Sequence, residues 1–164
     1  MTKTRSTNGT PAIRVLETAG IRFEVRAYDH DPAVRSFGTE AAAKLGVDPR
    51  RVFKTLLISV DDELVMAIIP VSAQLDLRAL AAAIGGKKAV LAGVAEAERR
   101  TGYVVGGMSP FGQRRPVPAV LDNSALAFDR ILISGGRRGL DVEVAPNDVV
   151  MLTDARLARV ARGD

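Results

Sequence analysis

The chain has 164 residues, 47% of them hydrophobic, and its 23 Lys and Arg against 19 Asp and Glu give a net charge of +4 and a pI near 9.8. The absence of cysteine excludes disulfides, thiolate zinc sites and a cysteine nucleophile, and the single histidine, His30, excludes a multi-histidine metal site. We therefore expect one soluble cytoplasmic domain over residues 10–164, after a disordered tail over residues 1–9, with no membrane span.

Short helices and strands are predicted along the whole chain. In the first half, a helix is expected to begin at Thr10 and Pro11 and to end at Gly20, and a strand follows over 22–28. A second helix is expected between Thr39 as its cap and Gly46 as its end, followed by a turn at Asp48-Pro49. The strands 52–58 and 64–69 are then expected to form a hairpin around Asp61-Asp62. The second half predicts helices over 76–84 and 94–100, strands over 89–91, 119–121, 130–133 and 140–144, and a helical turn from Asn147. Without a regular βαβ alternation, this order favours an α+β fold: a mixed, curled β-sheet or barrel flanked by short helices.

Lys54 is the most informative single residue, because it interrupts a strand that is otherwise apolar. Residues two apart on a strand share a face, so Lys54 is expected to point with Val52, Leu56 and Ile58 toward the core. Burying an unpaired ammonium costs several kcal/mol or lowers its pKa. Lys54 therefore either faces a ligand or extends its amine back to water from the end of the strand.

Charged residues elsewhere carry weaker signals. His30 lies in the acidic segment 28–32 and is expected to be a surface loop or turn residue, with a ligand contact as the alternative. Five adjacent basic pairs fall in predicted turns or at element ends, where they can reach a polyanion or simply be solvated: Arg50-Arg51, Lys87-Lys88, Arg99-Arg100, Arg114-Arg115 and Arg137-Arg138.

Two glycine-rich segments, 102–112 and 134–141, fit neither a dinucleotide fingerprint nor a P-loop. Glycine allows backbone N–H groups to approach a ligand closely, although such segments can also simply form tight turns. Tyr103 is expected to pack in the core beside the first segment.

Taken together, five motifs in register resemble the YbaK/EbsC family, and most nearly the bacterial YbaK-type Cys-tRNA(Pro) deacylases. They are Thr10-Pro11-Ala12, Tyr28-Asp29-His30-Asp31-Pro32, Val52-Phe53-Lys54-Thr55-Leu56-Leu57, Gly102-Tyr103 with Gly106-Gly107-Met108-Ser109-Pro110-Phe111-Gly112, and Ser134-Gly135-Gly136-Arg137-Arg138-Gly139-Leu140-Asp141.

The resemblance implies a fold like the editing domain of prolyl-tRNA synthetase and a free-standing hydrolase that removes cysteine from mischarged Cys-tRNA(Pro). It further implies that the substrate's own thiol attacks the ester and releases a thiolactone. The implied partners are the acceptor end of tRNA(Pro) and prolyl-tRNA synthetase, with no DNA, membrane, metal or cofactor.

Seven residues carry over from the family. Lys54 and Gly106 are expected to be catalytic, and Tyr28, Phe37, Thr55, Ser134 and Asp141 to contact substrate. From the residues alone, Ser134 is equally suited to cap its own turn, and Asp141 to accept hydrogen bonds from its own loop. Phe37 alone would be a loop aromatic anchored in the core.

Three alternatives stay open. The chain could bind a tRNA end or a synthetase without hydrolysis, or it could deacylate Ala-tRNA(Pro). Thr55 directly after Lys54 favours a deacylase of cysteinyl esters, because family members that act on alanyl esters tend to have asparagine at that position. The third alternative is a lyase that uses Lys54 as a Schiff base, but no phosphate motif or second nearby lysine supports it.

Overall fold

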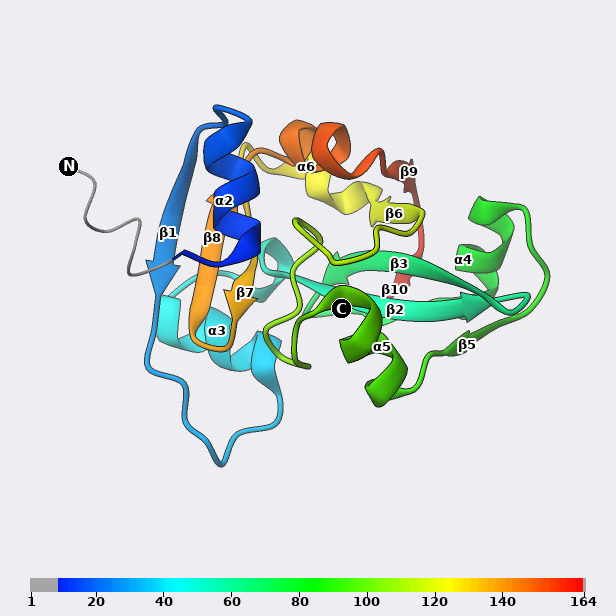
Figure 1. Ribbon diagram of the computed structural model, residues 1–164, viewed down its shortest axis with the longest axis horizontal. Helices are drawn as coiled ribbons and strands as arrows, with labels where there is room; N and C mark the ends of the chain where they lie inside the picture. Colours follow the sequence, from blue (N-terminus) through cyan, green and yellow to red (C-terminus); the bar gives the residue numbers. More distant parts are fainter. Residues whose placement is uncertain (1–8, 164) are drawn as a thin grey trace.

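The structure is a computed structural model that describes residues 9–163 (Figure 1). The predicted disordered tail therefore lies outside the described residues, apart from Gly9. The helices are α2 (Pro11–Thr18), α3 (Phe37–Leu45), α4 (Leu77–Ile84), α5 (Val94–Thr101) and α6 (Pro146–Thr153), with 3-10 turns at η1 (Pro49–Arg51) and η2 (Asn123–Ala127). The strands are β1 (Phe23–Ala27), β2 (Phe53–Val60), β3 (Glu63–Pro70), β4 (Gln74–Leu75), β5 (Ala89–Leu91), β6 (Ala119–Asp122), β7 (Ile131–Arg137), β8 (Leu140–Val144), β9 (Arg156–Ala158) and β10 (Ala161–Arg162).

The strands form three sheets. One has the antiparallel order β1-β8-β7, the second has the mixed order β5-β2-β3-β6-β9, and β10 pairs with β4 in the third. An isolated parallel bridge between Val52 and Leu132 joins the first two sheets at the start of β2. The predicted α+β fold with a mixed sheet is confirmed, but within residues 9–163 the strands do not close into a barrel.

Both faces of β2 are covered, which the sequence pattern did not predict. Phe53 and Leu57 belong to the largest core, shared with α2 and with β7 and β8, whereas Ile58 and Val60 belong to a second core under α4. A third, smaller cluster joins α3 to Val52. Lys54 thus lies at the start of β2, a strand that is buried on both faces, next to the bridge that joins the two sheets.

Two local predictions differ from the structure, and one segment for which no element was predicted forms strands. Ser36, not Thr39, is the N-cap of α3, because the Thr39 hydroxyl instead donates to the Ser36 carbonyl at 3.1 Å. The second glycine segment is not a loop but the β7–β8 hairpin, with a bulge between Ser134 and Arg137. The segment after Asp154 forms the edge strand β9 and the short strand β10.

Polar contacts hold both ends of the described chain. The Thr10 hydroxyl caps α2 and donates to the Gly135 carbonyl, 125 residues away, at 2.5 Å. One carboxylate oxygen of Asp122 accepts from the backbone N–H groups of Val160 and Ala161, at 2.8 and 2.9 Å. Among the described residues, no helix has the length and apolar character that crossing a membrane would need.

Candidate active site

A cavity of about 420 Å³ lies where the two larger sheets meet. One wall is the start of β2, the second is Tyr28, directly after β1, with Ser134 and Asp141 of β7 and β8, and the third is the first turn of α3. Leu91 and Val94 also line the cavity, yet they are 65% and 60% exposed, so they mark its mouth. All seven residues that the sequence singled out line this cavity: Tyr28, Phe37, Lys54, Thr55, Gly106, Ser134 and Asp141.

Lys54 and Thr55 bring polar groups without protein partners to the cavity. The ammonium of Lys54 is half-buried and makes no hydrogen bond or ion pair with the described residues, and burial lowers its pKa. The hydroxyl of Thr55 is buried and has no hydrogen-bond partner among those residues. Unpartnered polar groups are costly in a protein interior, so both are available to a ligand.

Asp141, Tyr28 and Ser134 form the wall built by the other sheet. Asp141 is only 6% exposed, and burial raises the pKa of its carboxyl to about 7, opposed by the charge of Arg26, its cross-strand neighbour. Burial, with the nearby charge of Asp141, raises the pKa of Tyr28 to about 12, so the phenol stays protonated. The Ser134 hydroxyl accepts from the Gly136 N–H at 3.1 Å and thus caps its own turn.

Gly106 and Phe37 pack against each other beside the cavity. Gly106 has φ +90°, and a Cβ at this position would lie 2.6 Å from Cγ of Phe37, so only glycine fits. The Gly106 N–H makes no hydrogen bond with the described residues, whereas that of Gly107 donates to the Val104 carbonyl at 2.9 Å. The Gly106 N–H is therefore available to a ligand at the cavity wall.

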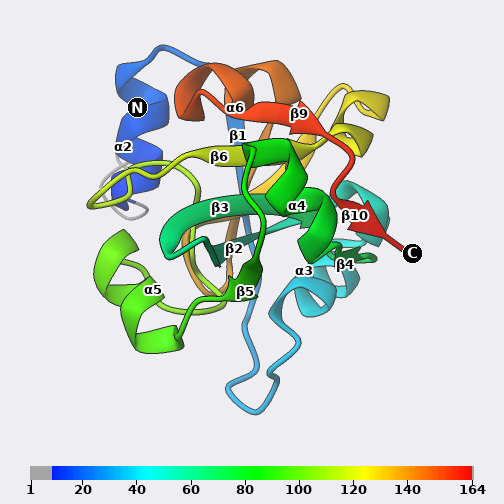
Figure 2. The same ribbon diagram turned by 90° about the vertical axis from the view of Figure 1, so that its right-hand side faces the viewer.

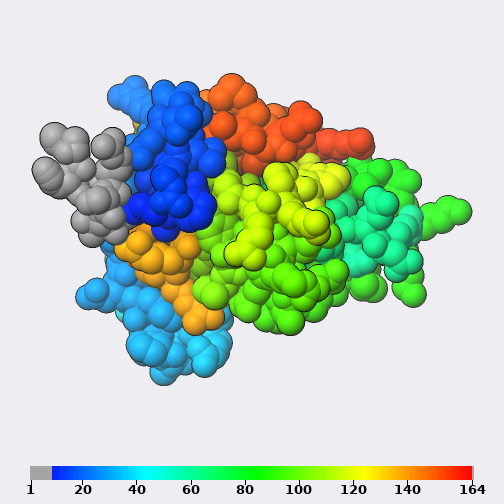
Figure 3. Space-filling view, viewed as in Figure 1, coloured from blue at the N-terminus to red at the C-terminus, as the bar shows by residue number. Residues whose placement is uncertain are grey.

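The two glycine segments meet at this wall. A Cβ on Gly107 would lie 2.6 Å from Cα of Arg137, so the segments are in backbone contact. The Arg138 guanidinium donates from Nε to the Val105 carbonyl at 2.8 Å and lies 4.7 Å from the centroid of the Phe37 ring. In the space-filling view the β7–β8 hairpin (orange) reaches the surface between the 28–44 segment and the green segment that carries α5 (Figure 3).

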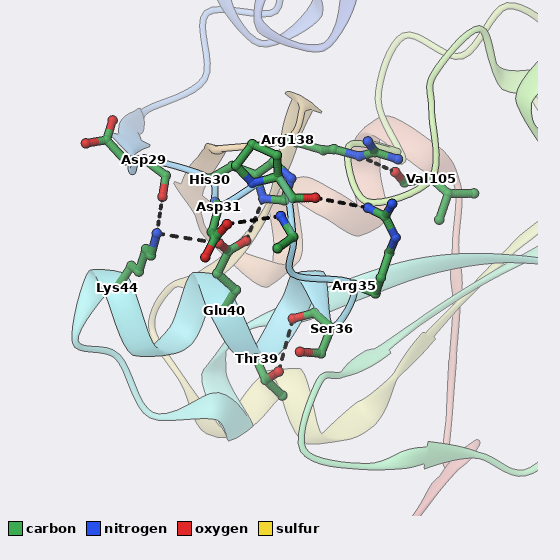
Figure 4. A network of polar contacts seen from close by, with 12 residues as sticks. Asp29, His30, Asp31, Arg35, Ser36, Thr39, Glu40, Lys44, Val105 and Arg138 are labelled. Atoms are coloured by element: carbon green, nitrogen blue, oxygen red, sulfur yellow. Dashed lines mark hydrogen bonds and ion pairs between the residues drawn. The ribbon is translucent and has the colours of Figure 1, made fainter.

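A paired network holds the segment before α3 (Figure 4). The buried carboxylate of Glu40 accepts from the Asp31 N–H at 2.8 Å, contacts His30 Nδ1 at 2.7 Å and lies 3.5 Å from Lys44 Nζ. Burial raises the pKa of Glu40, but these hydrogen bonds and cations outweigh it and hold the pKa below its ordinary value. His30 lies in a loop as expected, but its side chain is only 16% exposed, and its ring is tilted by 43° to that of Phe37 with the centroids 5.6 Å apart.

Sequence reasoning missed several parts of this site. Arg138 was noticed as half of a basic pair and within a family motif but not as a site residue, and its place over Phe37 depends on the β7–β8 bulge. Glu40 was not singled out, although a charged residue just before the buried Ala41 and Ala42 was a usable signal. The apolar wall and mouth, including Leu57, Leu91 and Met108, gave no pattern different from ordinary core. Tyr103, predicted to be core, is 4% exposed as expected.

The cavity wall offers the Lys54 ammonium, the Gly106 N–H, the buried Thr55 hydroxyl and the Asp141 carboxyl, whose pKa is raised to about 7, and Arg35 also lines the cavity. Such a set can orient a small polar ligand and stabilise negative charge that develops on its oxygen atoms. Within residues 9–163 no group of three or more His, Asp or Glu side chains is placed to hold a metal ion.

The comparisons with known proteins agree on a family. The model of the aminoacyl-tRNA editing domain matches residues 31–152. The chain is 32% identical, over 163 residues and 98% of both chains, to EbsC of Enterococcus faecalis (strain ATCC 700802 / V583), provisionally named a Cys-tRNA(Pro)/Cys-tRNA(Cys) deacylase. It is also 32% identical over 99 residues, 60% of this chain and 59% of the other, to the multifunctional Ser/Thr-tRNA deacylase ProXp-y of Escherichia coli (strain K12).

Solved structures show the same fold. The hypothetical protein APE2540 matches with a TM-score of 0.84 and 25% identity, over 93% of this chain and 100% of that one. A protein provisionally described as a trans-editing enzyme for prolyl-tRNA synthetase matches with a TM-score of 0.80 and 24% identity, over 95% and 98% of the two chains.

Proposed function

The chain belongs to the aminoacyl-tRNA editing domain family and is an aminoacyl-tRNA deacylase, and we propose that its substrate is Cys-tRNA(Pro), from which it releases cysteine. EbsC, the relative named for this activity, aligns over nearly the whole chain and supports the choice of substrate. A tRNA-directed enzyme of this kind would act in the cytoplasm.

One observation carries the proposal: the unpaired Lys54 ammonium and the free Gly106 N–H border the same cavity. An aminoacyl ester is already activated, so its cleavage requires orientation and stabilisation of the oxyanion more than a strong nucleophile. A cavity of about 420 Å³ is also in the usual range for small ligands and suits an amino acid joined to a ribose.

In the proposed mechanism the aminoacyl group enters the cavity and the Gly106 N–H donates to its carbonyl oxygen. Lys54 stabilises the negative charge that develops on the ester. The substrate thiol loses its proton, its sulfur forms a bond to the carbonyl carbon, and the bond to the ribose oxygen breaks. The ribose oxygen takes up a proton, which leaves a free tRNA end and a thiolactone that water opens to cysteine.

The remaining residues then bind and orient. Thr55 supplies an unpartnered hydroxyl, Phe37 and Tyr28 supply ring surfaces, and Asp141 supplies a carboxyl that is partly protonated near pH 7. Ser134 acts through the turn that it caps. Because no cysteine or second histidine is available, nucleophilic attack by the substrate itself fits this chain.

A second candidate is hydrolysis of seryl or threonyl esters, which the similarity to ProXp-y favours. Hydroxyl-bearing substrates could use the unpartnered Thr55 hydroxyl as well. Water would then replace the thiol as nucleophile, so the two candidates differ in their requirement for sulfur.

The proposed partners are the acceptor end of tRNA(Pro) and prolyl-tRNA synthetase. A synthetase pocket separates small side chains by only about 1–3 kcal/mol, so a separate hydrolytic site is needed for cysteine charged in place of proline. Binding to the synthetase–tRNA complex would deliver the mischarged end before it is used.

Single-turnover deacylation tests the proposal. Cys-tRNA(Pro), Ala-tRNA(Pro), Ser-tRNA(Pro) and Thr-tRNA(Pro) are each mixed with excess wild-type protein, Lys54→Ala, or the control Lys87→Ala, which changes an exposed lysine at the other end of β2. Rapid loss of the cysteinyl ester alone, abolished only by Lys54→Ala, is the expected result. Equal loss of all four esters would contradict thiol attack, and loss of the seryl and threonyl esters alone would favour the second candidate.

A further inference from the structure

We propose that Arg99, Arg100, Arg114 and Arg115 form a docking surface for the phosphate backbone of the tRNA acceptor stem. This inference rests on the proposed function for its choice of partner. It identifies which of the five basic pairs in the sequence bind the nucleic acid, and we call these four residues the arginine cluster.

The fold brings the two pairs of the cluster together. The Arg114 N–H donates to the Thr101 carbonyl at 2.9 Å, and the Arg115 N–H donates to the Arg100 carbonyl at 3.1 Å. The segment 113–115 therefore runs back along the end of α5. A Cβ on Gly102 would lie 3.6 Å from the Arg114 guanidinium, so this side chain covers the end of the helix.

The side chains of the cluster form no ion pair with the described residues, including Glu96 and Glu98 of α5. Arg99, Arg114 and Arg115 are exposed. Nε of Arg100 is buried and lacks a hydrogen-bond partner among these residues. Four guanidinium groups at one end of a helix repel one another unless an anion or solvent compensates, which favours a polyanionic partner.

The other basic pairs are used or placed differently. Arg51 pairs with Glu143, Arg50 pairs with Asp48, and Arg138 binds the Val105 carbonyl. Lys87 and Lys88 follow α4, where their backbone N–H groups donate to Asp61, at the end of β2 remote from Lys54. Over the eight residues of β2 that separation is about 25 Å.

The position of α5 connects the cluster to the cavity. Val94 and Ala97 of this helix line the cavity, and Val94 lies at its mouth, whereas Arg99 and Arg100 lie in the last turn. The rise from Val94 to Arg100 is about 9 Å. A strand whose terminal nucleotide occupies the cavity and leaves over Leu91 and Val94 would thus reach the cluster within a few nucleotides. Figure 2 shows β5 leading directly into α5 at this side of the molecule.

Binding of deacylated tRNA(Pro), measured between 50 and 300 mM salt, tests the proposal without requiring hydrolysis. The variant Arg99→Gln/Arg115→Gln is compared with the control Lys87→Gln/Lys88→Gln, which removes the same charge from the remote end of β2. The cluster variant should bind about tenfold more weakly at 100 mM salt, and the magnitude of its log K against log[salt] slope should fall by about 1.8, or about 0.9 per lost contact. The control should match the wild type.

Deacylation of a short substrate, a cysteinyl CCA trinucleotide, gives the second readout. The cluster variant should cleave it at the wild-type rate while cleaving full-length Cys-tRNA(Pro) more slowly at low enzyme concentration. An unchanged salt slope, or an equal loss in the control, would overturn the proposal, as would a defect seen only in the presence of the synthetase. If wild-type protein binds tRNA with this salt dependence but leaves cysteinyl esters intact, the proposed function fails and the docking surface stands.

Discussion

Phe37 adjoins two groups of polar residues, the network around Glu40 and the cavity, and the two groups differ in how completely they are paired. In the network before α3, Glu40 joins His30, Asp31 and Lys44, so every charge has a partner. In the cavity, the Lys54 ammonium and the Thr55 hydroxyl have none among the described residues. Unpaired groups are the more costly, so the first group builds the wall of the site and the second is left for substrate.

The largest effect should follow from changing the unpaired cation. Lys54→Met keeps the apolar stem but removes the charge, so deacylation should fall by at least about 100-fold, as for loss of a single oxyanion donor. Because burial disfavours the ammonium, the free energy of unfolding should stay the same or rise. Single-turnover kinetics and urea titration of the same sample measure both. A stability loss as large as the activity loss would show that Lys54 belongs with the paired group.

Changing the paired group should reduce the free energy of unfolding more than the activity, the opposite of the effect expected for Lys54→Met. Glu40→Ala leaves His30 and the Asp31 N–H without their buried acceptor, so the free energy of unfolding should fall by about 2–3 kcal/mol. Glu40→Gln, which retains an acceptor, should recover part of this loss. Activity measured well below the melting temperature should fall less than for Lys54→Met. A catalytic loss without a stability loss would contradict the assignment of Glu40 to the wall.

A pair of glycine variants separates backbone strain from blocking of the site. Gly106→Ala and Gly85→Ala both place alanine at positive φ, +90° and +84°, which should cost about 1 kcal/mol of stability in each. Only Gly106→Ala also inserts a methyl group against the Phe37 ring, whereas nothing lies within 4 Å of a Cβ at Gly85. Deacylation should therefore fall about tenfold or more in the first variant alone. Equal activity in the two variants would show that the contact with Phe37 is unimportant.

The smallest effect concerns Asp141, whose pKa is raised from 3.8 to about 7 by burial. Between these values the folded state binds more protons than the unfolded state, so stability decreases as pH rises and levels off above about pH 7. The expected loss between pH 6 and pH 8 is about 1.4 kcal/mol. Asp141→Asn should remove this loss, with urea titrations at the two pH values as the measurement. If Asp141→Asn still loses this stability between pH 6 and pH 8, the group that releases the proton is not Asp141.

Local signals predicted most of the fold. Asp76 and Gly85 bound α4 as expected, the Asp61-Asp62 turn joins β2 to β3, and the resemblance to the YbaK/EbsC family is confirmed. The failures depend on distant partners. The strand β9 exists because it pairs with β6, and no local pattern in residues 156–158 indicates this.

The site was predicted unevenly. Lys54 was found from its own strand pattern, because a lysine in an apolar strand is unusual wherever it lies. Phe37 was found only through the family, since nothing in its neighbours distinguishes it from a core aromatic. The contact of Arg138 with Phe37 depends on a hairpin bulge and on α3, which lie far apart in the chain, and no single-sequence pattern indicates such a contact.

The hydrogen bond from Thr10 to Gly135 has a consequence for how the chain folds. This bond closes a loop of 125 residues, and β1 likewise pairs with β8, a strand that comes much later in the chain. Contacts of such sequence separation carry a large loop-closure entropy and slow the search for the native state. On the ribosome, α2 and β1 emerge before β7 and β8 and acquire these partners only after the residues between them have been made, so we expect the largest core to assemble late.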